Sequence, residues 1–226
     1  MIEKGISYPI RSDNWVAQHI IGGMLWLFSW LLFPAFFILG YYMDASKRII
    51  QGDDEPPDFD DWGELLILGL KGTAVSIIYT TVPVVLVVML AILVWMFGLG
   101  LGSTGFTATG VALIFVAIIV YLFSLYILPA SLIHMTMEDD LTAAFHMGTI
   151  AHICMSGGYI LSSLVTVVIG IVGLIAMAVF STITFGIGSL FVPFFTHTFY
   201  LAVVSFYAEN YRNLLGQRDE QQTTVA

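Results

Sequence analysis

Three long stretches without a single charged residue constrain the fold of this chain more than any other feature. No Asp, Glu, Lys or Arg occurs in residues 14–43, 72–137 or 141–208, which are 30, 66 and 68 residues long. A helix needs roughly 20 apolar residues to cross the hydrocarbon core of a bilayer. The stretches therefore have room for one, two and two crossings, and they predict a multi-pass α-helical membrane protein.

Composition supports this class and excludes others. The 226 residues are 58% hydrophobic and 10% charged, whereas soluble domains carry about 25% charged residues. A net charge of −9 argues against nucleic-acid binding, which requires a basic surface. The single cysteine, Cys154, excludes an internal disulfide and a thiolate-rich metal site.

We therefore predict an all-α, polytopic transmembrane helical bundle with about five spans. The expected spans are residues 20–42, 72–97, 109–133, 156–180 and 186–207, with interfacial helical segments near 60–71 and 139–155. The expected domain organisation is an N-terminal polar segment (1–19), one integral membrane domain (20–210) with an acidic loop at 44–64, and a polar C-terminal tail (211–226).

The distribution of basic residues predicts the orientation. Five spans place the termini on opposite sides, and the side with more Lys and Arg faces the cytoplasm. Five basic residues then lie inside (Lys47, Arg48, Lys71, Arg212 and Arg218) and two lie outside (Lys4 and Arg11). The alternative is that residues 15–42 form a re-entrant hairpin broken near Pro34, which puts both termini inside.

A short pattern recurs before three apolar runs. Asp13-Asn14-Trp15, Asp60-Asp61-Trp62 and Asp139-Asp140-Leu141 are each followed seven positions later by a glycine, at Gly22, Gly69 and Gly148. One interpretation is an internal duplication. The other is shared helix-start chemistry, because Asp and Asn are favoured N-caps and glycine allows close helix contact in lipid.

The acidic loop is the most distinctive stretch of the chain. Pro56 and Pro57 favour an extended backbone, while Phe59 and Trp62 suit the membrane–water interface. These four residues form either an interfacial elbow or a cytoplasmic loop that binds a partner or responds to ions. Sixteen carboxylates against three lysines also suggest a halophilic source, with ordinary acidic loops as the alternative.

The same region carries a family resemblance. Residues 40–43 (Gly-Tyr-Tyr-Met), the acidic loop over 52–64 and Gly69-Leu-Lys71 resemble the archaeal family catalogued as domain of unknown function 4013. The resemblance is sharpest over residues 7–79. It implies a multi-pass membrane protein of a kind frequent in haloarchaea, and it implies no activity, ligand or catalytic residue.

His197 is the only ionisable side chain expected near the middle of a span. A charged imidazolium there would be costly, so we expect a neutral ring that faces protein or trapped water. Tyr79 and Ser76 are its candidate partners, because Pro83 loosens the backbone near them. At this polar site, His197 either makes an interhelical hydrogen bond that stabilises the bundle or lies on a path for a solute or for protons.

The leading functional prediction is a non-enzymatic protein of the cell membrane whose acidic cytoplasmic face binds a partner. The partners expected are the lipid bilayer and another membrane or cytoplasmic protein, or a second copy of the chain, and no nucleic acid. No catalytic, metal-binding or cofactor-binding residue is predicted. A small-solute permease or channel is the alternative, supported by polar residues and prolines within the spans; an enzyme acting on lipid is a third.

Overall fold

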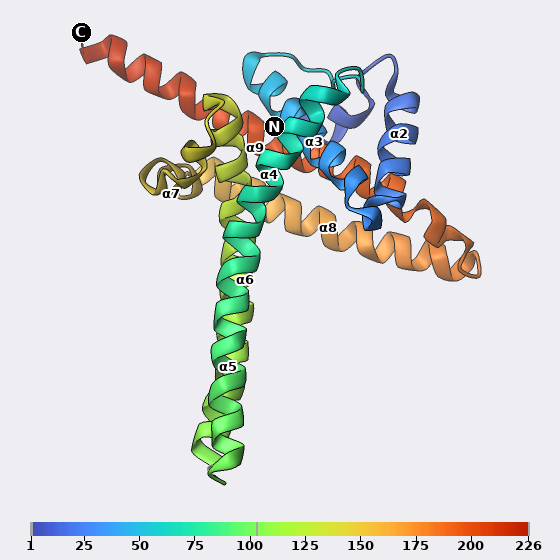
Figure 1. Ribbon diagram of the computed structural model, residues 1–226. Coiled ribbons are helices and arrows are strands. Elements are labelled where there is room, and N and C mark those ends of the chain that lie inside the picture. The colour runs from blue at the N-terminus through green and yellow to red at the C-terminus, as the bar shows by residue number, and fades with distance from the viewer. Residues whose placement is uncertain (1, 103, 226) are drawn as a thin grey trace. The chain divides into compact units, whose positions relative to one another are not determined.

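The structure is a computed structural model that describes residues 2–102 and 104–225, with side chains described up to residue 217 except for 2, 106 and 107. Every regular element in these residues is a helix, as Figure 1 shows. In chain order they are α1 (Ile2–Ser7), η1 (Tyr8–Ile10), α2 (Trp15–Leu27), η2 (Ser29–Leu31), α3 (Phe33–Gln51), α4 (Trp62–Ser76), η3 (Ile77–Thr81), α5 (Val82–Gly100), α6 (Thr104–Glu138), η4 (Leu141–Phe145), α7 (Met147–Cys154), α8 (Gly157–Ile183), η5 (Ile187–Phe191) and α9 (Val192–Val225). The all-α class is confirmed.

Four helical stretches are long and apolar enough to cross a membrane. They are Trp62–Gly100, Ala108–Glu138, Gly157–Ile183 and Ile187–Gln217. These stretches correspond to the last four expected spans, and the first of them also includes the expected segment at 60–71. The expected segment at 139–155 is helical as well, forming η4 and α7.

The expected first span, residues 20–42, is not a single helix. The chain leaves α2 after Leu27, makes the 3₁₀ turn η2, and enters α3 through Leu32, whose φ is +65°. Pro34 occupies the first turn of α3, where its missing N–H is tolerated; inside a continuous helix its ring would clash with the carbonyl group of Trp30. This break favours the re-entrant alternative over a complete crossing.

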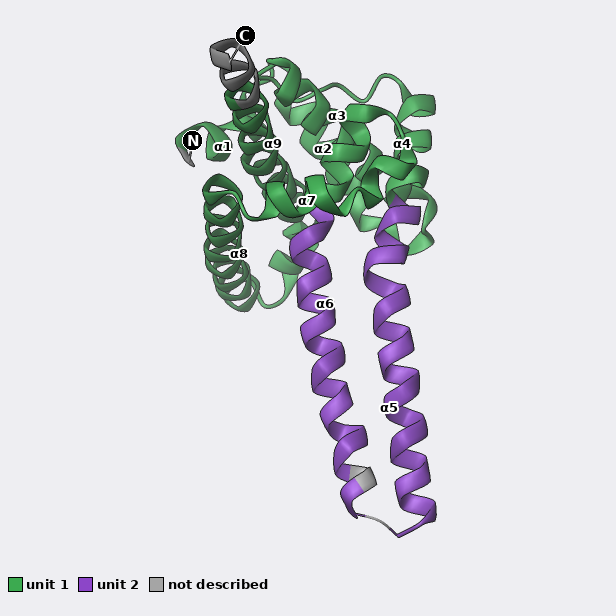
Figure 2. Ribbon diagram, turned by 90° about the vertical axis from the view of Figure 1, so that its left-hand side faces the viewer, with its two compact units in different colours: residues 1–72, 130–226 green, residues 73–129 purple. Residues whose placement is uncertain are grey.

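The chain divides into two compact units, residues 1–72 with 130–226 and residues 73–129 (Figure 2). We call them the core unit and the hairpin unit. In the core unit, α9 packs on α2, α3 and α8. The helix α9 also continues to Val225, where the sequence predicted a separate polar tail from residue 211.

Glycines allow close helix contacts within the core unit. A Cβ added at Gly40 of α3 would overlap the carbonyl oxygen of Leu65 in α4, and a Cβ at Gly69 of α4 would overlap that of Phe36 in α3. The two backbones therefore touch where α3 and α4 cross. Both glycines belong to the residues that carry the family resemblance.

The hairpin unit consists mainly of α5 and α6, which lie side by side in Figure 2. A Cβ added at Gly110 would lie 2.9 Å from the backbone of Trp95, so the helices meet closely there. Before α5, residues 77–81 form a π-helical turn in which the Val82 N–H bonds to the carbonyl oxygen of Ile77. The π turn lies just before Pro83, which cannot donate a helical hydrogen bond.

Candidate functional site

His197 of α9 is fully buried in the core unit. Its ring packs directly on the backbone of α2 at Gly22, where an added Cβ would overlap the imidazole. The absence of a side chain at Gly22 therefore makes room for the ring. The expectation that His197 faces protein is met by the geometry of α2 and α9.

A chain of hydrogen bonds fixes the protonation of this ring. The Trp26 indole N–H donates to the Tyr42 hydroxyl oxygen at 2.8 Å, and that hydroxyl lies 3.1 Å from Nδ1 of His197. Because an indole can only donate, the hydroxyl satisfies both neighbours by accepting from Trp26 and donating to His197. Nδ1 is then the acceptor, and the proton of the neutral imidazole lies on Nε2.

A second histidine lies beside the first. His19 and His197 have ring centroids 5.5 Å apart in an edge-to-face arrangement. Nδ1 of His19 lies 2.7 Å from the carbonyl oxygen of Trp15, and a carbonyl can only accept, so Nδ1 carries the proton and Nε2 keeps its lone pair. Both Nε2 atoms are buried without a hydrogen-bond partner in the part of the chain that the structure describes.

Aromatic rings connect this pair to the acidic loop. Phe59 stacks on Tyr41 with centroids 4.0 Å apart, and its ring centroid lies 6.3 Å from that of His197. Phe59 stands between the exposed carboxylates of Asp58 and Asp60. His197 therefore lies close to the charged loop, and its depth in the bilayer stays a prediction.

The structure identifies a hydrogen-bond partner of His197 that the sequence did not. That partner is Tyr42, within the Gly-Tyr-Tyr segment that carries the family resemblance. The expected partners Ser76 and Tyr79 belong to the hairpin unit, and their pairing with His197 stays a prediction. The sequence feature that could have indicated this partner is the presence of two aromatic hydrogen-bond donors, Trp26 and Tyr42, within the expected first span.

Gln18 of α2 anchors the acidic loop from below. Its buried amide nitrogen lies within 3.2 Å of the carbonyl oxygens of Pro56 and Pro57 and 3.0 Å from a carboxylate oxygen of Asp58. The Tyr8 hydroxyl donates to the carbonyl oxygen of Glu55 at 3.3 Å. Burial raises the pKa of Tyr8 well above its ordinary value, with Tyr41 and nearby carboxylates adding to the effect, so Tyr8 remains a neutral donor.

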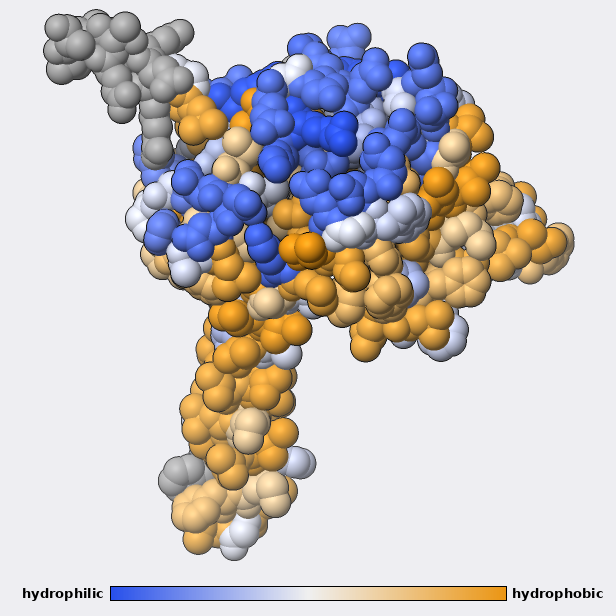
Figure 3. All heavy atoms as spheres, turned by 45° about the horizontal axis from the view of Figure 1, so that its top comes forward, coloured by the Kyte–Doolittle hydropathy of each residue, from blue (hydrophilic) through white to orange (hydrophobic). Residues whose placement is uncertain are grey.

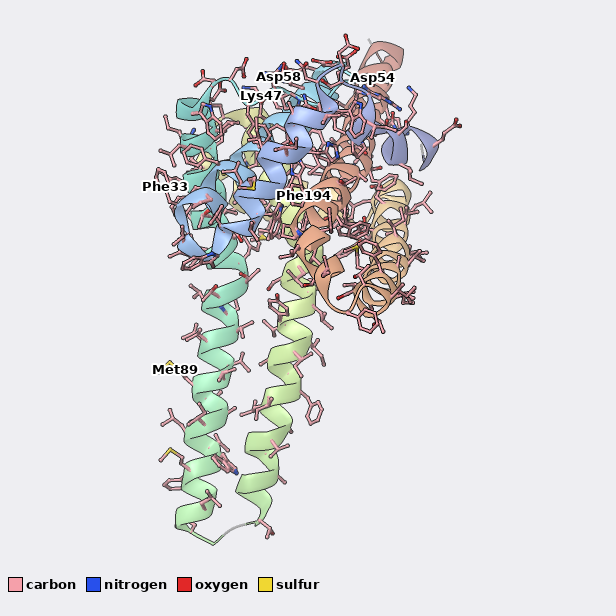
Figure 4. The ribbon with its side chains drawn as sticks, turned by 90° about the vertical axis from the view of Figure 1, so that its right-hand side faces the viewer. Phe33, Lys47, Asp54, Asp58, Met89 and Phe194 are labelled. Atoms are coloured by element: carbon pink, nitrogen blue, oxygen red, sulfur yellow. The ribbon has the colours of Figure 1, made fainter. Side chains whose placement is uncertain are left out.

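The two prolines of the loop are buried, whereas its carboxylates are exposed. Pro56 and Pro57 are buried and Phe59 is half-buried, whereas Trp62 is exposed. Seven exposed carboxylates surround them: Asp53, Asp54, Glu55, Asp58, Asp60, Asp61 and Glu64. Figure 3 shows hydrophilic residues gathered on one face of the molecule, and Figure 4 shows Lys47, Asp54 and Asp58 together at the same end of the core unit.

Few cations balance these carboxylates. Lys47 lies 3.9 Å from Glu64, and Arg212 lies 3.8 Å from Asp54. Arg212 also donates to the carbonyl oxygen of Ile49 at 2.9 Å, which ties α9 to the end of α3. Within the described residues, no three His, Cys, Asp or Glu side chains are grouped to hold a metal ion.

Comparison with known proteins gives one match. The family model described as "Protein of unknown function (DUF4013)" matches residues 27–182. No curated protein and no solved structure matches the chain. The matched region includes the break before α3, the acidic loop and the hairpin unit. The chain therefore belongs to the DUF4013 family of proteins of unknown function.

Proposed function

We propose that this protein is a non-enzymatic component of the cell membrane that binds a basic segment of a partner protein through its acidic loop. The observation that carries the proposal is that the prolines of the loop are buried while its carboxylates are exposed. Pro57 is less than 2% exposed and Phe59 stacks on Tyr41, while the seven carboxylates face outward. Favourable electrostatics on such a surface guides association and gives specificity.

The anchoring of the loop strengthens this proposal. A flexible loop loses conformational entropy when it binds, and this cost reduces affinity. Here Gln18 and Tyr8 already hold the backbone of residues 55–57 through hydrogen bonds. The carboxylates are thus held at fixed positions before a partner arrives, which favours a defined binding surface over a merely solvating one.

A small-solute permease is the second candidate. The observation in its favour is the contact of the buried His197 with His19, whose Nε2 atoms are both buried, because polar groups buried in a membrane domain often mark solute or proton pathways. Measured solute flux in vesicles separates this candidate from partner binding.

We also propose that the protein comes from a halophilic archaeon. An uncompensated acidic surface is better tolerated where concentrated salt screens the repulsion between carboxylates. The resemblance to a family frequent in haloarchaea supports the same source.

A matched pair of variants tests the proposed function. The loop variant combines Asp54→Asn, Glu55→Gln and Asp60→Asn; the control combines Glu3→Gln, Asp13→Asn and Glu138→Gln, three exposed carboxylates outside the loop. Both variants change the net charge equally. Binding of a fluorescent oligolysine peptide to the protein in nanodiscs is measured by anisotropy at several salt concentrations.

We expect the loop variant to lose about tenfold in affinity, equivalent to roughly 1.4 kcal/mol, and the control to lose much less. Cross-linking in native membranes should then recover a partner with the wild type and the control but not with the loop variant. Equal losses of peptide affinity in the two variants would show that only net charge attracts the peptide, and would contradict a loop-specific binding site.

A further inference from the structure

The buried His197 and the half-buried His19 have complementary hydrogen-bonding atoms, a donor on one ring and an acceptor on the other. The Tyr42 hydroxyl leaves His197 with a donor at Nε2, and the Trp15 carbonyl leaves His19 with an acceptor at Nε2. Neither atom has a partner among the described residues. A buried polar atom without a hydrogen bond costs about 1–3 kcal/mol, and the two rings that carry these atoms are in edge-to-face contact, which favours one molecule that satisfies both.

We propose that His19 and His197 together bind one small neutral molecule through a hydroxyl group, which accepts from Nε2–H of His197 and donates to Nε2 of His19. The chemistry is that of water or of the hydroxyl of a small alcohol. This site goes beyond the proposed binding of a partner at the acidic loop. It is independent of the loop carboxylates, and the two inferences can fail separately.

The spacing of the two rings suits a single bridging oxygen. Two hydrogen bonds of about 2.8 Å that meet at one oxygen join nitrogens roughly 4.5 Å apart. Imidazole rings with centroids 5.5 Å apart in an edge-to-face arrangement are compatible with that span. A single hydroxyl oxygen that accepts from one ring and donates to the other suits that span.

The surroundings select a neutral ligand. The rings of Tyr41, Tyr42 and Phe59 all lie within 6.3 Å of the His197 ring, measured between centroids. An ion in such an apolar shell would need a counter-charge. The packing of His197 on the backbone of Gly22 closes another side, so the ligand is held between α2 and α9 beneath Phe59.

Nuclear magnetic resonance of the protein in nanodiscs, with ¹⁵N-labelled histidine, tests the proposal directly. The expected result is a neutral His197 protonated at Nε2 and a neutral His19 protonated at Nδ1. In plain buffer the Nε2 proton of His197 should show a cross-relaxation signal to a bound water. Added methanol distinguishes the second source, since its methyl group should then give a signal to the same proton.

Either signal supports the site, and the pair of experiments identifies which molecule occupies it. Scalar coupling between the two Nε2 nuclei would instead show a direct N–H···N bond, and would overturn the proposal. The absence of both signals, or the same tautomer at both histidines, would overturn it as well. These measurements use the wild-type protein, so they do not depend on the folding of any variant.

Variants add a second readout. His19→Phe removes the acceptor and should abolish the water signal at His197, whereas His19→Gln supplies a new acceptor and should restore it. His152→Phe, which changes an exposed histidine of α7, is the matched control and should leave the signal unchanged. A water signal that survives in His19→Phe would contradict the role assigned to His19.

Discussion

The core unit and the hairpin unit bury different kinds of residue. In the core unit, α9 packs against α2, α3 and α8, and polar side chains such as Gln18 and His197 are buried among them. In the hairpin unit, Leu86, Met89 and Ile119 are all more than half exposed, and Figure 4 shows Met89 pointing outward from α5. No charged residue occurs within 73–129.

The difference shows where each unit obtains its stability. The core unit buries large side chains such as those of Tyr41, Tyr159 and Phe206 between its helices, although α8 leaves side chains such as Leu174 exposed. The hairpin unit buries mainly small residues such as Ala91 and Ala117 at its seam, and its large side chains need lipid or other apolar partners. The charged surface and the buried histidine pair both belong to the core unit.

The largest expected difference between the two units concerns membrane topology, because a fused reporter lies either on the cytoplasmic side or on the external side. Four crossings place the N-terminus and the acidic loop on one side and the connection after α5 on the other. Reporters fused at the N-terminus and at Gly52 should both read cytoplasmic, and a reporter at Gly102 should read external. An external N-terminus would restore a complete crossing by residues 20–42 and break the assignment of α2 and α3 to the core unit.

The second largest difference is expected in the free energy of unfolding when a large side chain is truncated in each unit. Leu201 of α9 is completely buried, so Leu201→Ala should lower the free energy of unfolding by about 2–5 kcal/mol. Leu86→Ala in the hairpin unit removes an exposed side chain and should change it by less than about 0.5 kcal/mol. Denaturation of both variants in the same detergent measures the difference; similar losses would mean that the hairpin unit has a packed core of its own.

Glycine substitutions sharpen the comparison at the level of the backbone. Gly69→Ala forces a Cβ against the Phe36 carbonyl in the core unit, and we expect a loss of about 1–3 kcal/mol from overpacking. Gly100→Ala in the hairpin unit meets no atom within 4 Å and should be neutral or slightly stabilising. The melting temperatures of the two variants check this, and an unaffected Gly69→Ala protein would contradict the contact between α3 and α4.

Salt should affect the core unit and not the hairpin unit. The Debye length, the distance over which salt screens the repulsion among the carboxylates, is roughly 3 Å at 1 M salt and roughly 10 Å at 0.1 M. The repulsion is therefore stronger at the lower salt concentration. We expect the melting temperature of the purified protein to fall as salt is lowered through this range, and the loop variant with three neutralised carboxylates to fall less. Equal melting temperatures at both salt concentrations would remove the case for a halophilic source.

The smallest expected effect concerns the ion pair between Lys71 and Asp139, 2.9 Å apart at the surface of the core unit. The hydrogen bond and charge of Lys71 lower the pKa of Asp139. A lowered carboxyl pKa adds stability above the unfolded pKa, near 3.9, and that stability is lost as the pH falls through the folded value. Asp139→Asn and Lys71→Gln should therefore lie slightly below the wild type in melting temperature at pH 7 and converge with it below pH 3.

The recurring helix-start pattern shows how far local sequence determines structure. The Asp61 carboxylate accepts a hydrogen bond from the Glu64 N–H at 3.0 Å, and Asp140 accepts one from the Thr142 N–H, as N-caps do. Asn14 makes no side-chain cap. The three associated glycines also differ: Gly22 and Gly69 lie at close helix contacts, whereas an added Cβ at Gly148 meets nothing within 4 Å. The pattern thus reports shared helix-start chemistry more than a shared packing role.

By itself, the sequence determined the helical class, the four long apolar helices, the acidic loop and the family. These features depend on composition and on spacing along the chain, because a bilayer requires long uncharged helices whatever their neighbours are. The break before α3 was only an alternative, since Pro34 is compatible with either a kink or a new helix start.

Only the tertiary structure decided the neighbours of His197. Its position along α9 suggested partners in another long span, but α2 and α3 bring Gly22, Tyr42 and Phe59 of the acidic loop against it. Those contacts join residues up to 175 positions apart, and hydrogen bonds between distant segments leave no periodic signal in the sequence. The buried histidine pair is a product of chain packing, and it could not be derived from spacing alone.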